Sequence, residues 1–414
     1  MCGFVVSLGG RGSDRFIRRR GPDALGVVQR DGLRFAHYLL HVTGSPTVQP
    51  FVDGDVVALY NGEIYNLPFA HSDGENIIPA YREHGALFPR YLDGEFAIAL
   101  YDFAAGLAYF ATDRFATKPL WRNGAECASY ESGVGGHKIA ANTVESVSID
   151  TGATFHVGHY HEWDWRQHVT RYDDCIEAFV SAVDKRYAPR CFIGLSSGYD
   201  SGAIACALRG REFKAYSVLA AETREIIAER IEALDDVELI EAFDVAAQER
   251  HLREHAEPFR YRIRYDDGPG DGDYRDDFAA KALSHICSLA HAEGRKVCLS
   301  GGGADEILAD YSLIPRQSEF KGHFPDELRE WSNFTGSCQY SYLGKEECVG
   351  GSWGIETRYP FLDTAFVQSF LSLAAPLKNR HYKAPIYEYL RREGFPFERD
   401  RKIGFAPREE RAHV

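Results

Sequence analysis

The first 165 residues of the chain alternate short apolar runs with glycine, aspartate and asparagine, a pattern typical of β-strands joined by turns. Helical spacing of apolar residues predicts one helix, over Glu75–His84. We therefore expect a β-rich first domain with little helix. The apolar runs predict strands at Gly3–Leu8, Leu33–Leu40, Val56–Tyr60, Phe96–Tyr101 and Leu107–Ala111.

From about residue 170 the pattern changes, and predicted strands alternate with predicted helices. Such alternation indicates a parallel, doubly wound sheet of the α/β class. We therefore expect two domains, residues 1–165 and residues 170–414. The predicted strands of the second domain are Cys191–Leu195, Phe213–Leu219, Val237–Phe243 and Lys296–Leu299. Its predicted helices cover Asp173–Tyr187, a segment from about Ser201, Glu222–Leu234 and Asp276–Glu293.

Composition and charge limit the classes of binding partner and the cellular compartment that we expect for this protein. A net charge of −14 argues against a nucleic-acid backbone or an anionic membrane surface as the main partner. No window resembles a signal peptide or an apolar membrane span of about 20 residues. The nine cysteines lack CxxC pairs and metal-type spacing, which favours reduced thiols. The sequence therefore predicts a cytoplasmic protein that binds neither nucleic acid nor membrane.

The segment LSSGYDSG (Leu195–Gly202) lies where a predicted strand ends and a predicted helix begins. Glycine and serine there allow several backbone N–H groups to point into one concavity, and the helix N-terminus adds positive potential. This is a phosphate cradle, although a similar segment elsewhere is often only a turn. Asp200 beside a phosphate suggests a Mg²⁺ ligand, because hard cations bridge carboxylate and phosphate oxygens.

The segment LSGGGADE (Leu299–Glu306) repeats this arrangement after the fourth predicted strand. It combines a glycine-rich turn with the acidic pair Asp305 and Glu306. In a doubly wound sheet both loops lie at the carboxyl edge, where ligands bind. Together they predict a nucleoside triphosphate with Mg²⁺ between the two loops.

Cys2 has an unusual position, since removal of Met1 would make it the first residue. Its α-amine, with a pKa of about 8, would then be available as the general base for its own thiol. On position alone, a small apolar residue at the start of a buried strand is the simpler interpretation.

Longer motifs decide between these interpretations. LSSGYDS resembles the pyrophosphate loop, LSGGxDS, of PP-loop ATP pyrophosphatases, and with SGGGADE and WGIETRYPFLD it resembles the asparagine synthetase family. The first half is similar to that family's class II glutamine amidotransferase domain, which begins with cysteine at position 2. The matching segments there are RRGPD (Arg19–Asp23), NGEIYN (Asn61–Asn66), SDGE (Ser72–Glu75) and DRFATKPLW (Asp113–Trp121).

The resemblance covers nearly the whole chain and implies both a fold and a reaction. The fold is an N-terminal α+β sandwich of the Ntn-hydrolase class, with αββα layers, followed by an α/β domain like the adenine nucleotide alpha hydrolases. In the reaction, the first domain hydrolyses glutamine to glutamate and ammonia. The second adenylates a carboxylate with ATP and Mg²⁺, and ammonia that has passed through an internal tunnel attacks the acyl-adenylate.

By resemblance, Cys2 is the glutaminase nucleophile, Asn61 and the Gly62 N–H form the oxyanion hole, and Glu63 and Asp73 bind the glutamine amine. The family arginine that holds the glutamine carboxylate lies in an HxRLS segment. Here that segment is HYLLHVTG (His37–Gly44), and Leu39 takes the arginine's place. Either Arg20 or His41 compensates, or glutamine binds weakly.

In the second domain the resemblance implies that Asp200 and Asp305 hold Mg²⁺. Lys383 would stabilise charge during adenylation or amine attack, and Val218 would contact adenine. The other candidates for binding ATP and pyrophosphate are Leu195, Ser196, Ser197, Gly198, Ser201, Gly301, Gly302 and Gly303.

Departures from the family pattern limit the acceptor. Asparagine synthetases carry an acid in the second loop, SGEGSDE, where this chain has Gly302, and Ser197 and Tyr199 replace a glycine and an aliphatic residue in the first. The chain is also shorter than typical members. We therefore expect a small-molecule or sugar carboxylate other than free aspartate, such as a uronic-acid sugar, a natural product or a phage-encoded metabolite.

Several alternatives stay open. The chain could be an asparagine synthetase proper, or a ring-closing ligase like the β-lactam synthetases, although Cys2 argues against the latter. A binding protein without activity is a third alternative, against which Cys2, Asn61, Asp200, Asp305 and Lys383 argue. The oligomeric state is also open, with a homodimer among the states.

Overall fold

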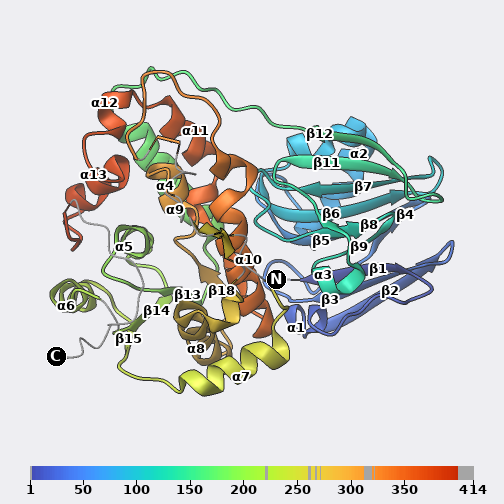
Figure 1. The fold of residues 1–414 in the computed structure, drawn as a ribbon, viewed down its shortest axis with the longest axis horizontal. Helices are drawn as coiled ribbons and strands as arrows, with labels where there is room; N and C mark the ends of the chain where they lie inside the picture. The colour runs from blue at the N-terminus through green and yellow to red at the C-terminus, as the bar shows by residue number, and fades with distance from the viewer. Residues whose placement is uncertain are drawn as a thin grey trace. The chain divides into compact units, whose positions relative to one another are not determined.

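The computed structural model describes residues 2–219, 222–259, 263–265, 268–270, 272–311, 319–320 and 322–399. Spatial clustering divides the chain into two compact units, each with its own sheets (Figure 1). The first unit comprises Met1–Trp163, His255–Phe259 and Trp331–Glu356. The second comprises Asp164–Glu254, Arg260–Glu330 and Thr357–Val414.

The first unit contains two antiparallel six-stranded sheets. One has the order β10-β8-β9-β1-β3-β2, and the other the order β12-β11-β7-β6-β5-β4. The strands of the former are His137–Lys138, Trp121–Asn123, Glu126–Ala128, Gly3–Leu8, Leu33–Leu39 and Ala24–Arg30 in that order. Those of the latter are Thr154–His159, Thr143–Ser148, Leu107–Thr112, Gly94–Asp102, Val56–Ile64 and Phe51–Asp53.

Alternating side chains form the core between these sheets. Phe4 and Phe35 from one sheet and Leu59 and Tyr101 from the other are fully buried in a single apolar cluster. A second cluster lies between the opposite face of the β4–β12 sheet and the helical segment made of η1 (Asp73–Asn76), α2 (Ile77–His84) and η2 (Gly85–Tyr91).

The outer face of the other sheet, which contains β1 and β3, carries the helices α1 (Ile17–Arg20) and α3 (Glu131–Val134). Helix α1 also contacts α10 (Ser337–Ser352). The unit therefore has helix, sheet, sheet and helix layers. The segment that contains η4 (Ser332–Thr335) and α10 belongs to this unit although it follows most of the second unit in sequence.

The second unit is built on a sheet with the order β15-β14-β13-β18-β19. Pairing is parallel between β13 and each of its neighbours β14 and β18, and between β14 and β15, which confirms the predicted parallel sheet. The chain order reverses between β13 and β18, so the loops that follow these two strands flank the switch point, where such sheets bind ligands. The strand bounds are Val237–Ile240, Phe213–Val218, Cys191–Gly194, Val297–Leu299 and Glu356–Arg358.

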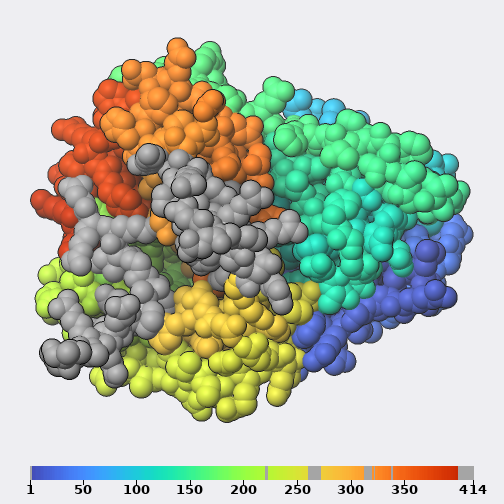
Figure 2. All heavy atoms as spheres, viewed as in Figure 1, coloured from blue at the N-terminus to red at the C-terminus, as the bar shows by residue number. Residues whose placement is uncertain are grey.

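Helices surround this sheet, and a hairpin of β16 (Ile263–Tyr265) and β17 (Gly268–Gly270) lies apart from it. Figure 2 shows α7 at the surface of the molecule, where Leu252 is its buried residue. The helices are α4 (Asp173–Arg186), α5 (Tyr199–Ala207), α6 (Arg224–Ala233), α7 (Val245–His255), η3 (Tyr274–Asp276), α8 (Phe278–Ala292), α9 (Ala304–Leu308), η5 (Pro360–Leu362), α11 (Thr364–Ser372), α12 (Ala375–Lys378) and α13 (Ala384–Arg392).

Two element boundaries differ from the prediction in ways that matter for the sites. β5 continues to Ile64 instead of ending at Tyr60, because Asn61 and Glu63 keep pairing with β6 although they interrupt the apolar run. α5 begins at Tyr199 instead of Ser201. Within the described ranges, no helix has both the length and the apolar character that a membrane crossing requires.

Candidate functional site

Cys2 immediately precedes β1 in the first unit and is half-buried. Its Sγ donates a hydrogen bond to the carbonyl oxygen of Leu40 at 3.7 Å. Burial raises the pKa of the Cys2 thiol to about 11, and the nearby carboxylates of Glu356 and Glu63 act in the same direction. The thiol is therefore protonated near neutral pH, so that a nucleophilic role requires a base.

Asn61, in β5, carries a buried polar group that no described residue satisfies. Its side chain is fully buried, and neither Nδ2 nor Oδ1 meets a hydrogen-bond partner among the described residues. Such a group costs free energy unless a ligand supplies the partner. The next residue, Gly62, has φ +138°, and a Cβ there would lie 1.8 Å from the carbonyl oxygen of Glu95. The strand thus accepts only glycine beside the orphaned amide.

Glu63 and Asp73 place two buried carboxylates near the end of β5. Thr43 Oγ1 donates to Glu63 Oε1 at 3.1 Å. Asp73 accepts a hydrogen bond from the Ile64 N–H at 2.7 Å and another from the Tyr60 hydroxyl. Burial raises the pKa of Asp73, against the effect of these hydrogen bonds. The acidic surroundings suit a ligand that carries an ammonium group.

Arg20 is fully buried and engaged by the protein. Its Nε donates to the carbonyl oxygen of Cys2 at 3.0 Å, and Nη1 donates to the Tyr130 hydroxyl at 2.6 Å and to the Glu347 carbonyl oxygen at 3.2 Å. Nη2 donates to Glu347 Oε2 at 2.9 Å. Because four of the five guanidinium N–H donors are used, these contacts favour a role in positioning the Cys2 backbone over one in binding the glutamine carboxylate.

Glu347 also joins Arg20 to a second buried cation. Lys118 Nζ lies 3.1 Å from Glu347 Oε1 and 3.4 Å from Glu95 Oε2, and all four side chains are almost inaccessible to solvent. Sequence analysis did not identify this network. Lys118 lies inside the DRFATKPLW motif and could have been noticed there, whereas nothing in the local sequence distinguishes Glu347.

In the second unit, the loop after β13 has hydroxyl groups that converge. The hydroxyl oxygens of Ser196 and Ser201 lie 2.8 Å apart. The Ser196 N–H donates to Ser201 Oγ at 3.0 Å, and the Gly198 N–H donates to Ser196 Oγ at 3.2 Å. Leu195 anchors the loop through its N–H, which donates to the Tyr216 carbonyl oxygen at 2.8 Å. The loop leads directly into the N-terminus of α5, an arrangement that suits an anionic ligand.

Two of the predicted nucleotide ligands, Ser197 and Val218, are buried in the protein. Ser197 is 1% exposed, and both its N–H and its hydroxyl donate to the Glu222 carboxylate. Val218 ends β14 and is also buried.

Asp200 and Asp305 lie in the first turns of α5 and α9, the helices that follow the two loops, and they converge on one ammonium group. Lys383 Nζ lies 2.5 Å from Asp200 Oδ1 and 2.7 Å from Asp305 Oδ1. The Tyr382 hydroxyl donates to Asp305 Oδ1 at 2.7 Å. Burial alone would lower the pKa of Lys383, but the two carboxylates raise it above its ordinary value. Burial next to Asp305 also raises the pKa of Glu306, to about 8.

The glycines of the second loop permit this convergence. A Cβ at Gly301 would lie 2.8 Å from the Cβ of Asp200, so the loop can approach α5 closely. A Cβ at Gly302 would lie 3.2 Å from the ring of Tyr359, which occupies the space next to that position. The next residue, Gly303, immediately precedes α9 and has φ +92°.

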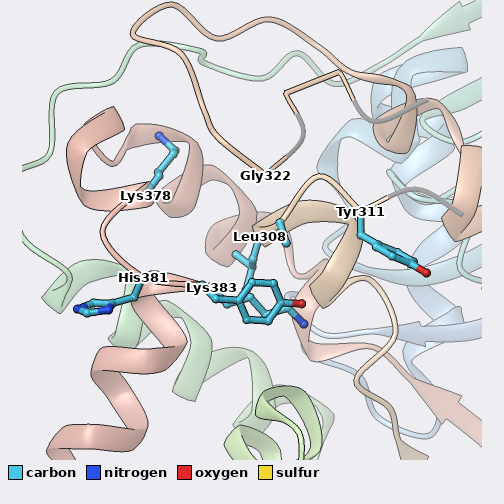
Figure 3. A pocket seen from close by; sticks show the side chains of 8 residues that line it. Leu308, Tyr311, Gly322, Lys378, His381 and Lys383 are labelled. Carbon is cyan, nitrogen blue, oxygen red and sulfur yellow. The ribbon is translucent and has the colours of Figure 1, made fainter. Parts of the chain in front are cut away.

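Beside Lys383 is a cavity of about 240 Å³. Lys383 lines the cavity (Figure 3), as does Tyr382. Both residues also contact Asp305, so the cavity adjoins the predicted site. The remaining lining residues are Leu308, Ala309, Tyr311, Gly322, Lys378 and His381.

Comparisons with known proteins agree with these observations. Residues 10–153 match the model of a glutamine amidotransferase domain, and residues 176–346 match that of asparagine synthase. The chain is 26% identical to asparagine synthetase 1 (glutamine-hydrolyzing) of Saccharomyces cerevisiae, in an alignment that covers 86% of this chain and 72% of that protein. It is 24% identical to asparagine synthetase B (glutamine-hydrolyzing) of Escherichia coli, with 85% and 70% covered.

Among solved structures, one match is the glutamine phosphoribosylpyrophosphate amidotransferase of B. subtilis, with 12% identity and a TM-score of 0.33 over 72% of this chain and 90% of that one. The two matched domains and the relatives define an ATP-dependent carbon–nitrogen ligase that takes its nitrogen from glutamine. The chain belongs to the asparagine synthetase family.

Proposed function

We propose that this ligase transfers the amide nitrogen of glutamine to a carboxylate other than free aspartate, after activating that carboxylate by adenylation. The products are an amide, glutamate, AMP and pyrophosphate. One observation supports the choice of acceptor above the others. Gly302 stands where asparagine synthetases carry an acid, and the ring of Tyr359 fills the space next to it.

The glutaminase step uses the residues around Cys2. Once Met1 is removed, the thiol gives its proton to the α-amine of the same residue, and the thiolate attacks the amide carbon of glutamine. The unpartnered Asn61 amide and the Gly62 N–H stabilise the oxyanion that forms. Ammonia leaves with the proton returned by the amine, and water then hydrolyses the thioester to glutamate. Glu63 and Asp73 hold the ammonium group of glutamine.

The synthetase step uses the two loops of the second unit. An oxygen of the acceptor carboxylate attacks the α-phosphorus of ATP, and pyrophosphate leaves. Ammonia then attacks the acyl carbon, and AMP leaves with the electron pair of the acyl–oxygen bond. Ser196, Gly198 and Ser201 receive the pyrophosphate, and Lys383 stabilises the negative charge that develops in either attack.

The carboxylates of Asp200 and Asp305 fit a Mg²⁺ ion. They converge closely enough to share one ammonium group, and carboxylate with phosphate oxygens is the donor set that Mg²⁺ prefers. The described residues contain no group of three or more metal-binding side chains, so phosphate oxygens of the substrate would complete the coordination. The bound ion would neutralise phosphate charge, and Asp200 and Asp305 are the residues that would hold it.

The cavity next to Lys383 is the proposed acceptor site. The residues that line it include Tyr311 and His381 together with Leu308 and Ala309. Hydrogen-bonding groups mixed with apolar ones suit a hydroxylated acid such as a uronic-acid sugar.

The test is ATP-dependent pyrophosphate release in the presence of glutamine, measured with a panel of carboxylates that includes aspartate and uronic acids. Turnover with an acid other than aspartate is expected. Strong turnover with aspartate would instead identify an asparagine synthetase proper. If the protein releases pyrophosphate from ATP when the substrate is a carboxylic acid with its own amino group and glutamine is absent, it is a ring-closing ligase.

A further inference from the structure

The peptide bond between Ser196 and Ser197 is held from both sides by buried charged groups. Its carbonyl oxygen accepts a hydrogen bond from Arg230 Nη1. Its N–H, which belongs to Ser197, donates to Glu222 Oε2. Arg230 is fully buried and Glu222 is 6% exposed. A cation on the carbonyl side and an anion on the N–H side together fix the direction of this peptide dipole.

Further contacts reinforce each side. The Ser197 hydroxyl donates to Glu222 Oε2 at 2.5 Å and accepts from the Thr223 N–H at 3.1 Å. Arg230 Nη2 donates to the Gly198 carbonyl oxygen at 3.0 Å. Glu222 and Thr223 immediately precede α6, and Arg230 lies in its last turn, so one short segment supplies the whole clamp.

The absence of a side chain at Gly202 leaves room for the guanidinium of Arg230. A Cβ on Gly202 would lie 2.3 Å from Arg230 Nη2, so a larger residue in this turn of α5 would displace the guanidinium. The third nitrogen of the guanidinium, Arg230 Nε, donates to the Pro396 carbonyl oxygen at 2.9 Å. The glycine after the loop motif therefore serves the clamp, and the motif itself gives no sign of this.

We propose that Glu222 and Arg230 are positioning residues that orient the Ser196–Ser197 peptide for the phosphates of ATP, and that Ser197 acts through Glu222 instead of contacting pyrophosphate. This proposal rests on the proposed function, since it assumes that ATP binds this loop. It also explains why position 197 is serine here, whereas the LSGGxDS motif has glycine at that position. The Ser197 hydroxyl is a second hydrogen-bond donor, beside the Ser197 N–H, to the buried Glu222 carboxylate.

The test uses the full-length protein and four variants, Glu222→Ala, Glu222→Gln, Ser197→Ala and the double variant Ser197→Ala with Glu222→Ala. Amide hydrogen exchange of a peptide that covers residues 195–201 reports on the clamp without nucleotide. Calorimetric titration with Mg·ATP reports on its effect on binding. Circular dichroism and urea unfolding of the same samples show whether each variant is folded.

We expect faster exchange in Glu222→Ala and ATP binding weakened about tenfold or more, because hydrogen bonds to a buried charge are lost. Glu222→Gln keeps an acceptor oxygen for Ser197, so it should recover part of the affinity. The double variant should bind ATP no more weakly than Glu222→Ala alone, because both changes break one interaction.

Unchanged exchange in Glu222→Ala would overturn the clamp, and so would additive losses in the double variant. If Glu222→Ala fails to fold, Ser197→Ala and Glu222→Gln decide by the same exchange measurement. A wild-type protein that binds no Mg·ATP would contradict the proposed function, and the exchange rates of the variants would still confirm or overturn the clamp.

Discussion

The guanidinium of Arg20 lies 2.9 Å from the carboxylate of Glu347, although 327 positions separate the two residues in the chain. Both side chains are buried, and the same guanidinium donates to the carbonyl oxygen of Cys2. The pair therefore joins α10 to the backbone of the proposed nucleophile within one compact unit. A residue from late in the sequence thus supports chemistry assigned to the first domain.

We expect Glu347→Gln to lower the free energy of unfolding by about 3–5 kcal/mol, because it removes the anion between two buried cations, Arg20 and Lys118. Glutaminase kcat should fall with it, since Arg20 loses the partner that fixes its contact with Cys2. Urea unfolding and glutamate release measure the two effects.

Glu393→Gln is the matched control, because its partner Arg209 is half-exposed and such pairs contribute about 0–1 kcal/mol. Equal losses in the two variants would contradict the importance of burial for the Arg20–Glu347 pair.

Replacement of the nucleophile should separate the two activities. We expect Cys2→Ala to abolish glutamine-dependent amide formation and to leave ammonia-dependent amide formation intact, because adenylation uses residues of the second unit. Amide formation is measured with each nitrogen source at saturating ATP. Loss of both activities would contradict independent sites.

The pH dependence of Cys2 alkylation tests the state of its thiol. Burial raises the pKa of Cys2 to about 11, and only the thiolate reacts. In the chain that keeps Met1, alkylation by iodoacetamide should therefore rise about tenfold per pH unit between about pH 7 and pH 10. Mass spectrometry of the N-terminal peptide measures the rate, and a plateau above about pH 8.5 would indicate an ordinary thiol.

The same experiment detects removal of Met1. In the processed chain the α-amine of Cys2 is free and can accept the thiol proton, so alkylation at neutral pH should be faster than in the unprocessed chain. Equal rates in the two forms would argue against the amine as base.

Asp305, in the first turn of α9, should matter for the synthetase half alone. We expect Asp305→Asn to reduce ATP-dependent pyrophosphate release by at least about a hundredfold, because a proposed metal ligand and a partner of Lys383 lose their charge. Glutaminase activity should be unchanged.

Tyr382→Phe is the control for this change, since it removes one hydrogen bond to Asp305 and leaves the carboxylate in place. At a saturating concentration of the acceptor it should have a much smaller effect on pyrophosphate release; the acceptor is saturated because Tyr382 also lines the proposed acceptor cavity. Unchanged pyrophosphate release in Asp305→Asn would remove Asp305 from the reaction.

Local sequence predicted much of this molecule. The alternation of strands and helices predicted the parallel sheet, and glycine with serine after two strands predicted two loops at one edge, because these signals lie within a few residues of each other. The convergence of Asp200 and Asp305 follows from the position of both loops beside the switch point.

Long-range partners were beyond the reach of such signals. The Ser197 side chain points toward Glu222, and the Arg20 side chain is bound by Glu347. Neither glutamate lies in a recognisable sequence motif. Side chains from distant segments decide whether a polar residue faces a ligand or the protein. The sequence therefore predicted where the two loops lie more reliably than it predicted the contacts of individual side chains in them.

The most direct test of the central claim follows the nitrogen. The protein is incubated with glutamine labelled with ¹⁵N in its side-chain amide, ATP, Mg²⁺ and the carboxylate that best supports pyrophosphate release. We expect ¹⁵N in the product amide, with glutamate, AMP and pyrophosphate formed in equimolar amounts. Glutamine hydrolysis without transfer of the label, or the formation of ADP and phosphate in place of AMP and pyrophosphate, would contradict it.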